Sequence, residues 1–144
     1  MTLTDALVFS VNGLALAYGG CTDWKRREIP NLVPLTLLLT GLLHWRTLPL
    51  RLLCMIAAAF ILLLSAKMAK SPLPGGDFKL LCALTFSAGP AVTLATTVLT
   101  GLAAAAVGLI TGNQIRRNIP LCTYVCFAYP AALGMFLLFS RIFQ

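Results

Sequence analysis

Residues 50–68 read LRLLCMIAAAFILLLSAKM, an apolar run that carries charge only at Arg51 and Lys67. A helix of about 20 mostly apolar residues is long enough to cross the hydrocarbon core of a bilayer, which is about 30 Å thick. The rest of the chain has the same character: of its 144 residues 59% are hydrophobic and 10% are charged, and the mean hydropathy is +0.90. Because soluble chains carry about 25% charged residues, this composition excludes an ordinary soluble domain and predicts a membrane protein.

Five further apolar segments surround this run. We expect helices at about residues 3–18, 32–43, 50–68, 77–89, 91–111 and 121–139. Polar stretches at 21–31, 70–77 and 112–120 separate them, and Gly89–Pro90 should break the chain between the fourth and fifth, since proline inside a helix costs about 3 kcal/mol. The fourth, about 20 Å long, is too short to span the bilayer unaided. The predicted fold is an all-α, polytopic membrane protein, a compact bundle of about six transmembrane helices that forms a single domain over residues 1–144.

The charges predict how this bundle is oriented. Eleven Lys and Arg stand against four acids, which gives a net charge of +7. With six crossings, one side of the membrane receives eight of the basic residues, namely Lys25, Arg26, Arg27, Lys67, Lys70, Lys79, Arg116 and Arg117. Because basic loops stay in the cytoplasm, that side is expected to be cytoplasmic and both chain termini extracytoplasmic. The excess of positive charge is thus assigned to the membrane surface, and no nucleic-acid partner is expected.

Cysteine usage gives no sign of a metal centre. The five cysteines are Cys21, Cys54, Cys82, Cys122 and Cys126, and no two of them form a CxxC pair. Most lie inside apolar runs, where a thiol behaves as a small hydrophobic group. We expect no disulfide, no metal and no cofactor. Asn12, in the middle of the first apolar segment, is expected to make a hydrogen bond between helices.

Asp23 and Asp77 are the candidate catalytic residues. The predicted crossings bring both to the cytoplasmic membrane surface, although they are 54 residues apart. Two carboxylates within a few ångströms cannot both ionise easily, so one holds a proton while the other accepts one, as in aspartic proteases. Gly75 and Gly76 are expected to give a backbone that a substrate can approach closely, and Pro30–Asn31 to fix how the chain re-enters the membrane.

The spacing alone leaves other functions open. Asp23 beside a basic loop can be a solvated counter-charge, and Asp77 before a helix can be its N-cap. A small multipass transporter or channel subunit is one alternative, in which paired acids couple ions near the middle of the bilayer. A non-catalytic assembly subunit of a pilus or secretion machine is another.

Three stretches of the sequence resemble the type IV prepilin peptidases. They are DWKRREIPN at 23–31, GDFKL at 76–80 and NIP at 118–120. The resemblance implies a bacterial intramembrane aspartic endopeptidase of the GxGD type, with Asp23 and Asp77 as the catalytic pair and Lys79 as the basic residue two positions beyond. It also implies a prepilin-like membrane substrate, whose basic leader is removed at the cytoplasmic face of the inner membrane.

The chain departs from the family pattern in two ways. Pro74 stands where the family has the first glycine of its motif. The chain also lacks room for the cytoplasmic insertion and methyltransferase activity of larger members, so peptidase activity without methylation is expected. In this compactness it is similar to the short peptidases of tight-adherence (Flp) pilus systems.

Overall fold

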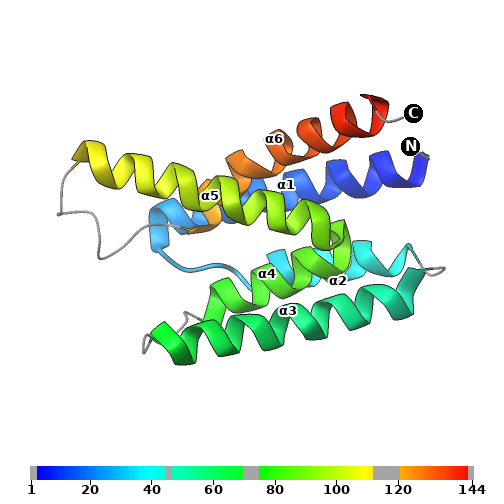
Figure 1. Ribbon diagram of the computed structural model, residues 1–144, viewed down its shortest axis with the longest axis horizontal. Helices are drawn as coiled ribbons and strands as arrows, with labels where there is room; N and C mark the ends of the chain where they lie inside the picture. The colour runs from blue at the N-terminus through cyan, green and yellow to red at the C-terminus, as the bar shows by residue number, and fades with distance from the viewer. Residues whose placement is uncertain (1–2, 45–46, 70–74, 112–120, 143–144) are drawn as a thin grey trace.

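The computed structural model describes residues 3–44, 47–69, 75–111 and 121–142, and these form six α-helices (Figure 1). The helices are α1 (Leu3–Arg26), α2 (Leu32–Leu42), α3 (Leu48–Ala69), α4 (Gly75–Ala88), α5 (Pro90–Thr111) and α6 (Leu121–Ile142). The described residues include no strand. The expected all-α fold is confirmed.

Among the described residues, two helices are long and apolar enough to cross a membrane. They contain the segments Leu48–Met68, with a mean hydropathy of 2.3, and Pro90–Val107, with a mean hydropathy of 1.7. Large apolar side chains on the first of them, such as Leu53 and Phe60, are exposed on the outside of the bundle. Apolar surface of this extent needs a nonaqueous environment, which indicates a membrane protein.

The helices form two groups of three (Figure 1). In one half, α6 packs against both α1 and α5; in the other half, α4 packs against both α2 and α3. The halves meet mainly where α1 packs on α2 and where α4 continues into α5, with few contacts from α4 to α1 and α6. Their relative position therefore depends on a small number of contacts.

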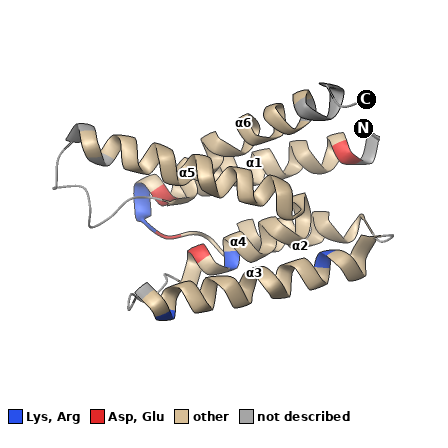
Figure 2. Cartoon of the chain, in the orientation of Figure 1, with Lys and Arg blue, Asp and Glu red and all other residues tan. Residues whose placement is uncertain are grey.

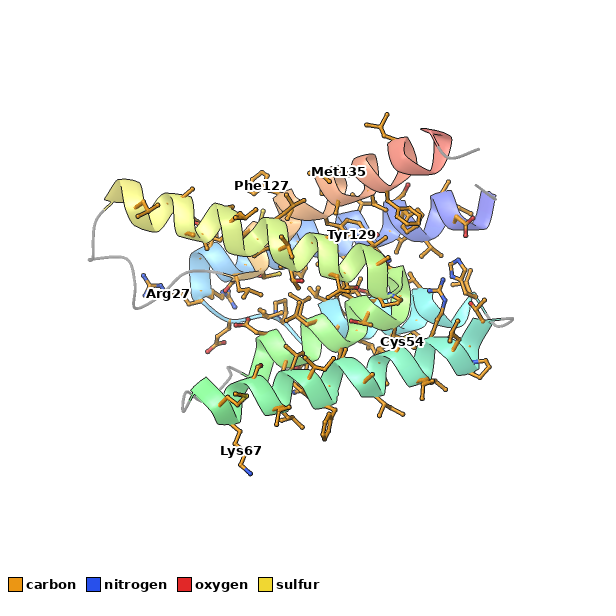
Figure 3. All side chains as sticks on the ribbon, viewed as in Figure 1. Arg27, Cys54, Lys67, Phe127, Tyr129 and Met135 are labelled. Atoms are coloured by element: carbon orange, nitrogen blue, oxygen red, sulfur yellow. The ribbon has the colours of Figure 1, made fainter. Side chains whose placement is uncertain are left out.

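The buried core lies where these helices meet. Leu16 of α1, Leu37 of α2, Leu84 of α4 and Val125 of α6 are all fully buried in one cluster. Figure 3 shows Tyr129 within the bundle, whereas Phe127 and Met135 of the same helix point outward, in agreement with exposed fractions of 1%, 74% and 60%.

Helix α1 is longer than the sequence predicted. It continues through Gly19 and Gly20 to Arg26, so the polar stretch expected at 21–31 is helical over its first half. Glycine often ends helices in soluble proteins, but in membrane helices it also allows close packing. A Cβ atom at Gly19 would lie 2.9 Å from the Cys122 sulphur. The helix ends at Arg26, and the next residue, Arg27, has a left-handed φ of 55° and an N–H that donates to the Asp23 carbonyl at 2.9 Å.

The expected break between α4 and α5 is confirmed at Gly89, which has a φ of +88°, and Pro90, which begins α5. Because proline has no N–H, the Phe86 carbonyl loses the donor that would continue the helix. Arg51 of α3 replaces it: its Nη1 donates to the Phe86 carbonyl at 3.0 Å and also to the Ser87 carbonyl. The end of the short helix α4 is thus satisfied inside the protein.

Gly41 of α2 lies against Phe86 of α4, and its substitution tests the packing of these helices. A Cβ atom there would overlap the Phe86 ring, which is 3% exposed and has little room to move, and would lie 3.2 Å from the Phe86 carbonyl oxygen. We expect Gly41→Ala to lower the free energy of unfolding by about 1–3 kcal/mol, measured by thermal unfolding in detergent. Gly101→Ala on α5 is the control, because no atom lies within 4 Å of its Cβ position and alanine favours a helix by about 1 kcal/mol. Equal stability of the two variants would contradict this contact.

Candidate active site

Asp23 lies in the last turn of α1 and is 6% exposed. Its Oδ2 accepts a hydrogen bond from the Cys122 backbone N–H at 2.9 Å. Cys122 is the second residue of α6, where backbone N–H groups have no partner within the helix. A carboxylate at this position is stabilised both by the hydrogen bond and by the positive end of the helix dipole.

Two glycines bring the start of α6 within reach of Asp23. A Cβ atom at Gly20 would lie 3.3 Å from the Thr123 Cα, and one at Gly19 would meet the Cys122 side chain. The Thr123 hydroxyl also donates to the Gly20 carbonyl at 3.0 Å. The close crossing of α1 and α6 therefore allows the backbone of α6 to hold the carboxylate.

Asp77 lies in the first turn of α4 and is partly buried. Burial raises the pKa of its carboxyl group above the usual value, and the negative charge of Asp23 raises it further. The two acidic segments, at the end of α1 and the start of α4, lie at the same end of the bundle in Figure 2. The structure thus brings together the two carboxylates that the sequence singled out, one from each half of the molecule.

The connection between α1 and α2 lies against the first turn of α4. A Cβ atom at Gly76 would be 3.5 Å from the Ile29 Cβ. After Ile29, the carbonyls of Pro30 and Asn31 accept hydrogen bonds from the first turns of α2 at 3.0 and 3.2 Å, and the Asn31 side chain makes no capping bond. Pro30 and Asn31 thus lie at the start of α2, directly after the residue that contacts the first turn of α4.

Gly75 and Gly76 belong to α4, whereas the sequence predicted a non-helical segment there. Gly75 is exposed, and no atom of the described residues lies within 4 Å of its Cβ position. Lys79, the other predicted supporting residue, is exposed on α4 just beyond Asp77. Pro74 and the NIP stretch at 118–120 lie outside the described residues.

Sequence reasoning missed the Cys122 N–H, because a backbone donor leaves no mark in the residue types. Pro120 was the one indication in the sequence. It precedes the apolar run at 121–139 and predicts that a helix, with free N–H groups in its first turn, begins directly after it. Among the described residues, no three His, Cys, Asp or Glu side chains gather where they could hold a metal ion.

An apolar groove of about 580 Å³ lies between α1 and α6, on another face of these helices. Gly20 and Cys126 are among its lining residues, and Trp24 and Lys25 lie where it reaches the end of α1. The groove places apolar surface within one turn of Asp23.

An all-α membrane protein with a coupled carboxylate pair at one end of its bundle has the arrangement of a membrane-embedded hydrolase. The type IV leader peptidase family matches residues 10–112, a range that contains both Asp23 and Asp77. The chain belongs to this family and is therefore a leader peptidase, an endopeptidase that acts on prepilin-type precursors. Comparison with the curated proteins and with the solved structures gives no match.

The coupling of the two carboxylates can be measured without a substrate. Replacing Asp23→Asn removes one of the two causes that raise the pKa of Asp77, so its midpoint of deprotonation should move to lower pH. The pH dependence of carbodiimide labelling at Asp77, read by mass spectrometry, reports this midpoint, because the reagent modifies the protonated carboxyl group. Glu28→Gln, at an exposed acid of the connection after α1, is the control. Equal midpoints for wild type and Asp23→Asn would contradict the coupling.

Proposed function

We propose that this chain is an aspartic-type endopeptidase that removes the basic leader from Flp-like type IV prepilins or pseudopilins, with Asp23 and Asp77 as the catalytic pair. The observation that carries the proposal is the electrostatic coupling of two carboxylates, which the fold brings together from α1 and α4. Membership of the leader peptidase family supplies the substrate class.

The two carboxylates have different surroundings, which suggests different roles. Asp77 has the raised pKa and holds the shared proton, whereas the Asp23 carboxylate accepts the hydrogen bond of the Cys122 N–H. A water between them loses a proton to Asp23 and attacks the scissile carbonyl carbon, while Asp77 protonates the carbonyl oxygen. Collapse of the tetrahedral intermediate breaks the C–N bond: the proton held by Asp23 passes to the leaving amine, and one hydroxyl of the intermediate returns its proton to Asp77 as the new carboxyl group forms. No covalent intermediate forms.

The supporting residues surround Asp77. The space above Gly75 gives the substrate backbone room beside Asp77, and Gly76 allows the Ile29 segment to lie against the same turn. We assign Lys79, which is exposed on α4 two residues after Asp77, to orienting or electrostatically tuning the pair. Pro30 and Asn31 act through the connection that joins the Asp23 helix to α2.

The charge distribution supports an active site at the cytoplasmic face of a bacterial inner membrane. Basic residues gather at the end of the bundle that carries the carboxylates (Figure 2). They are Lys25 and Arg26 in the last turn of α1, Lys67 in the last turn of α3, and Lys79 two residues after Asp77. By the positive-inside tendency this end is cytoplasmic. The chain then crosses the membrane about six times, and both termini, which lie together at the opposite end in Figure 1, are extracytoplasmic.

Leader removal tests the catalytic assignment. A tagged Flp-type prepilin is co-expressed with wild type, Asp23→Asn, Asp77→Asn or Glu28→Gln at matched membrane levels, and the cleaved fraction is followed by gel shift. We expect wild type and Glu28→Gln to cleave, and each Asp→Asn change to lower the rate by at least about 100-fold, since each removes an acid–base group. Cleavage that survives both Asp→Asn changes would rule out the aspartic mechanism. Cleavage by wild type would also show that Pro74 is compatible with activity.

A reporter fused at the C-terminus tests the orientation. Alkaline phosphatase folds only outside the reducing cytoplasm, so its fusion after Gln144 should be active, while a fusion in the basic stretch at 112–120 should be inactive. The opposite pattern would place the carboxylate pair on the extracytoplasmic side.

A further inference from the structure

A closed ring of hydrogen bonds joins the two halves of the molecule. Asn12 of α1 is fully buried, and its Nδ2 donates to the Ser87 Oγ of α4 at 2.6 Å. The Thr40 hydroxyl of α2 donates to the Asn12 Oδ1, also at 2.6 Å, and the Ser87 and Thr40 hydroxyls lie 2.9 Å apart. With Thr40 donating to Asn12, Ser87 donates to Thr40, so each side chain gives one hydrogen bond and receives one. We call Asn12, Thr40 and Ser87 the polar ring.

The position of Asn12 on α1 connects the ring to Asp23. Asn12 lies 7 residues after Asp5 and 11 residues before Asp23. At 3.6 residues per turn these spacings are about two and three turns, so all three side chains lie on one face of the helix. Asp5 is also bonded to the other half, by the His44 Nε2 at 2.9 Å. A rotation or a shift of α1 at Asn12 would therefore move Asp23.

The position of Ser87 on α4 connects the ring to Asp77. Ser87 lies 10 residues after Asp77, about 15 Å along the same helix. Arg51 holds the carbonyl of this same residue, so the end of α4 is fixed both through its side chain and through its backbone. The ring thus joins the helix of one carboxylate to the helix of the other.

The ring contributes more to geometry than to stability. A hydrogen bond between membrane helices adds little to stability on average, and apolar residues would fill the same space. If Asn12 is replaced by leucine, Ser87 can still donate to Thr40 and Thr40 to the Leu37 carbonyl, which is 2.9 Å away, so both hydroxyls keep an acceptor. What such a variant loses is the hydrogen-bonded contact of α1 with α2 and α4.

We infer that Asn12, Thr40 and Ser87 are positioning residues that fix the rotation and height of α1 relative to α4 and thereby set the separation of the Asp23 and Asp77 carboxylates. The inference rests on the proposed function in so far as these carboxylates are catalytic. The geometric part stands on the hydrogen bonds alone.

Kinetics of four variants test the inference. Asn12→Leu and Thr40→Val break the ring, Thr40→Ser keeps its hydroxyl, and Thr96→Val is the matched control, a buried threonine of α5 whose hydroxyl donates to the Val92 carbonyl of its own helix. We expect Asn12→Leu and Thr40→Val to lower kcat by about 10- to 100-fold, with KM changed less than about twofold, because a displacement of about 1 Å has this cost. Thr40→Ser should restore most of kcat, and Thr96→Val should leave it unchanged.

The pH profile separates positioning from a loss of folded protein. When the carboxylates move apart, Asp23 no longer helps to hold the proton on Asp77, so the alkaline limb of kcat should shift to lower pH in Asn12→Leu and Thr40→Val. A smaller folded fraction would lower the rate equally at every pH. Reduced kcat with an unshifted limb would overturn the inference.

Cross-linking gives a readout that does not need activity. In a background with the five native cysteines replaced by alanine, Asp23→Cys and Asp77→Cys are joined by a short bifunctional thiol reagent, with and without Asn12→Leu. We expect the cross-linked fraction to fall severalfold with Asn12→Leu and not with Thr96→Val. An unchanged fraction would overturn the positioning role. If the fraction falls but wild type cleaves no prepilin, the positioning holds and the proposed function fails.

Discussion

The candidate site depends on one hydrogen bond, from the Cys122 N–H to Asp23. A carboxylate that is 6% exposed is costly to bury unless donors face it, and here the donor is backbone at the start of α6. That donor is within reach because Gly19 and Gly20 let α6 approach α1 closely. The position of one carboxylate is therefore determined by the absence of side chains on the turn before it.

Asp77 is positioned by a different device, a helix that ends inside the fold. Helix α4 is too short to cross a bilayer unaided, and Gly89–Pro90 separates it from α5. The carbonyls left over at the break would be costly in an apolar interior, and Arg51 satisfies two of them. Because its far end is fixed in this way, α4 can present its first turn, with Asp77, beside the end of α1.

The sequence was most informative where local chemistry decides the structure. Proline and glycine marked the break at 89–90, apolar runs marked six helices, and the expected interhelical hydrogen bond of Asn12 is confirmed. The predicted end of α1 was wrong because Gly19–Gly20 can either end a helix or let another helix pack closely. Only the position of α6 decides which of these roles the two glycines have. The partners of Asn12 and the donor to Asp23 are 28 to 99 residues away in the chain, so no local pattern could identify them.

The polar contacts of α1 matter for its position because the helix lies in lipid. In lipid, apolar helix faces pack against each other about as well as against acyl chains, so apolar contact alone gives two helices little preference for one register. Polar side chains give that preference, because a shift of one residue would leave a buried donor or acceptor without its partner. On α1 such groups occur near the start, the middle and the end of one face, at Asp5, Asn12 and Asp23. Asp5 bonds His44, just after α2, Asn12 bonds α2 and α4, and Asp23 bonds α6, so the placement of Asp23 depends on polar contacts along the whole length of the helix that carries it.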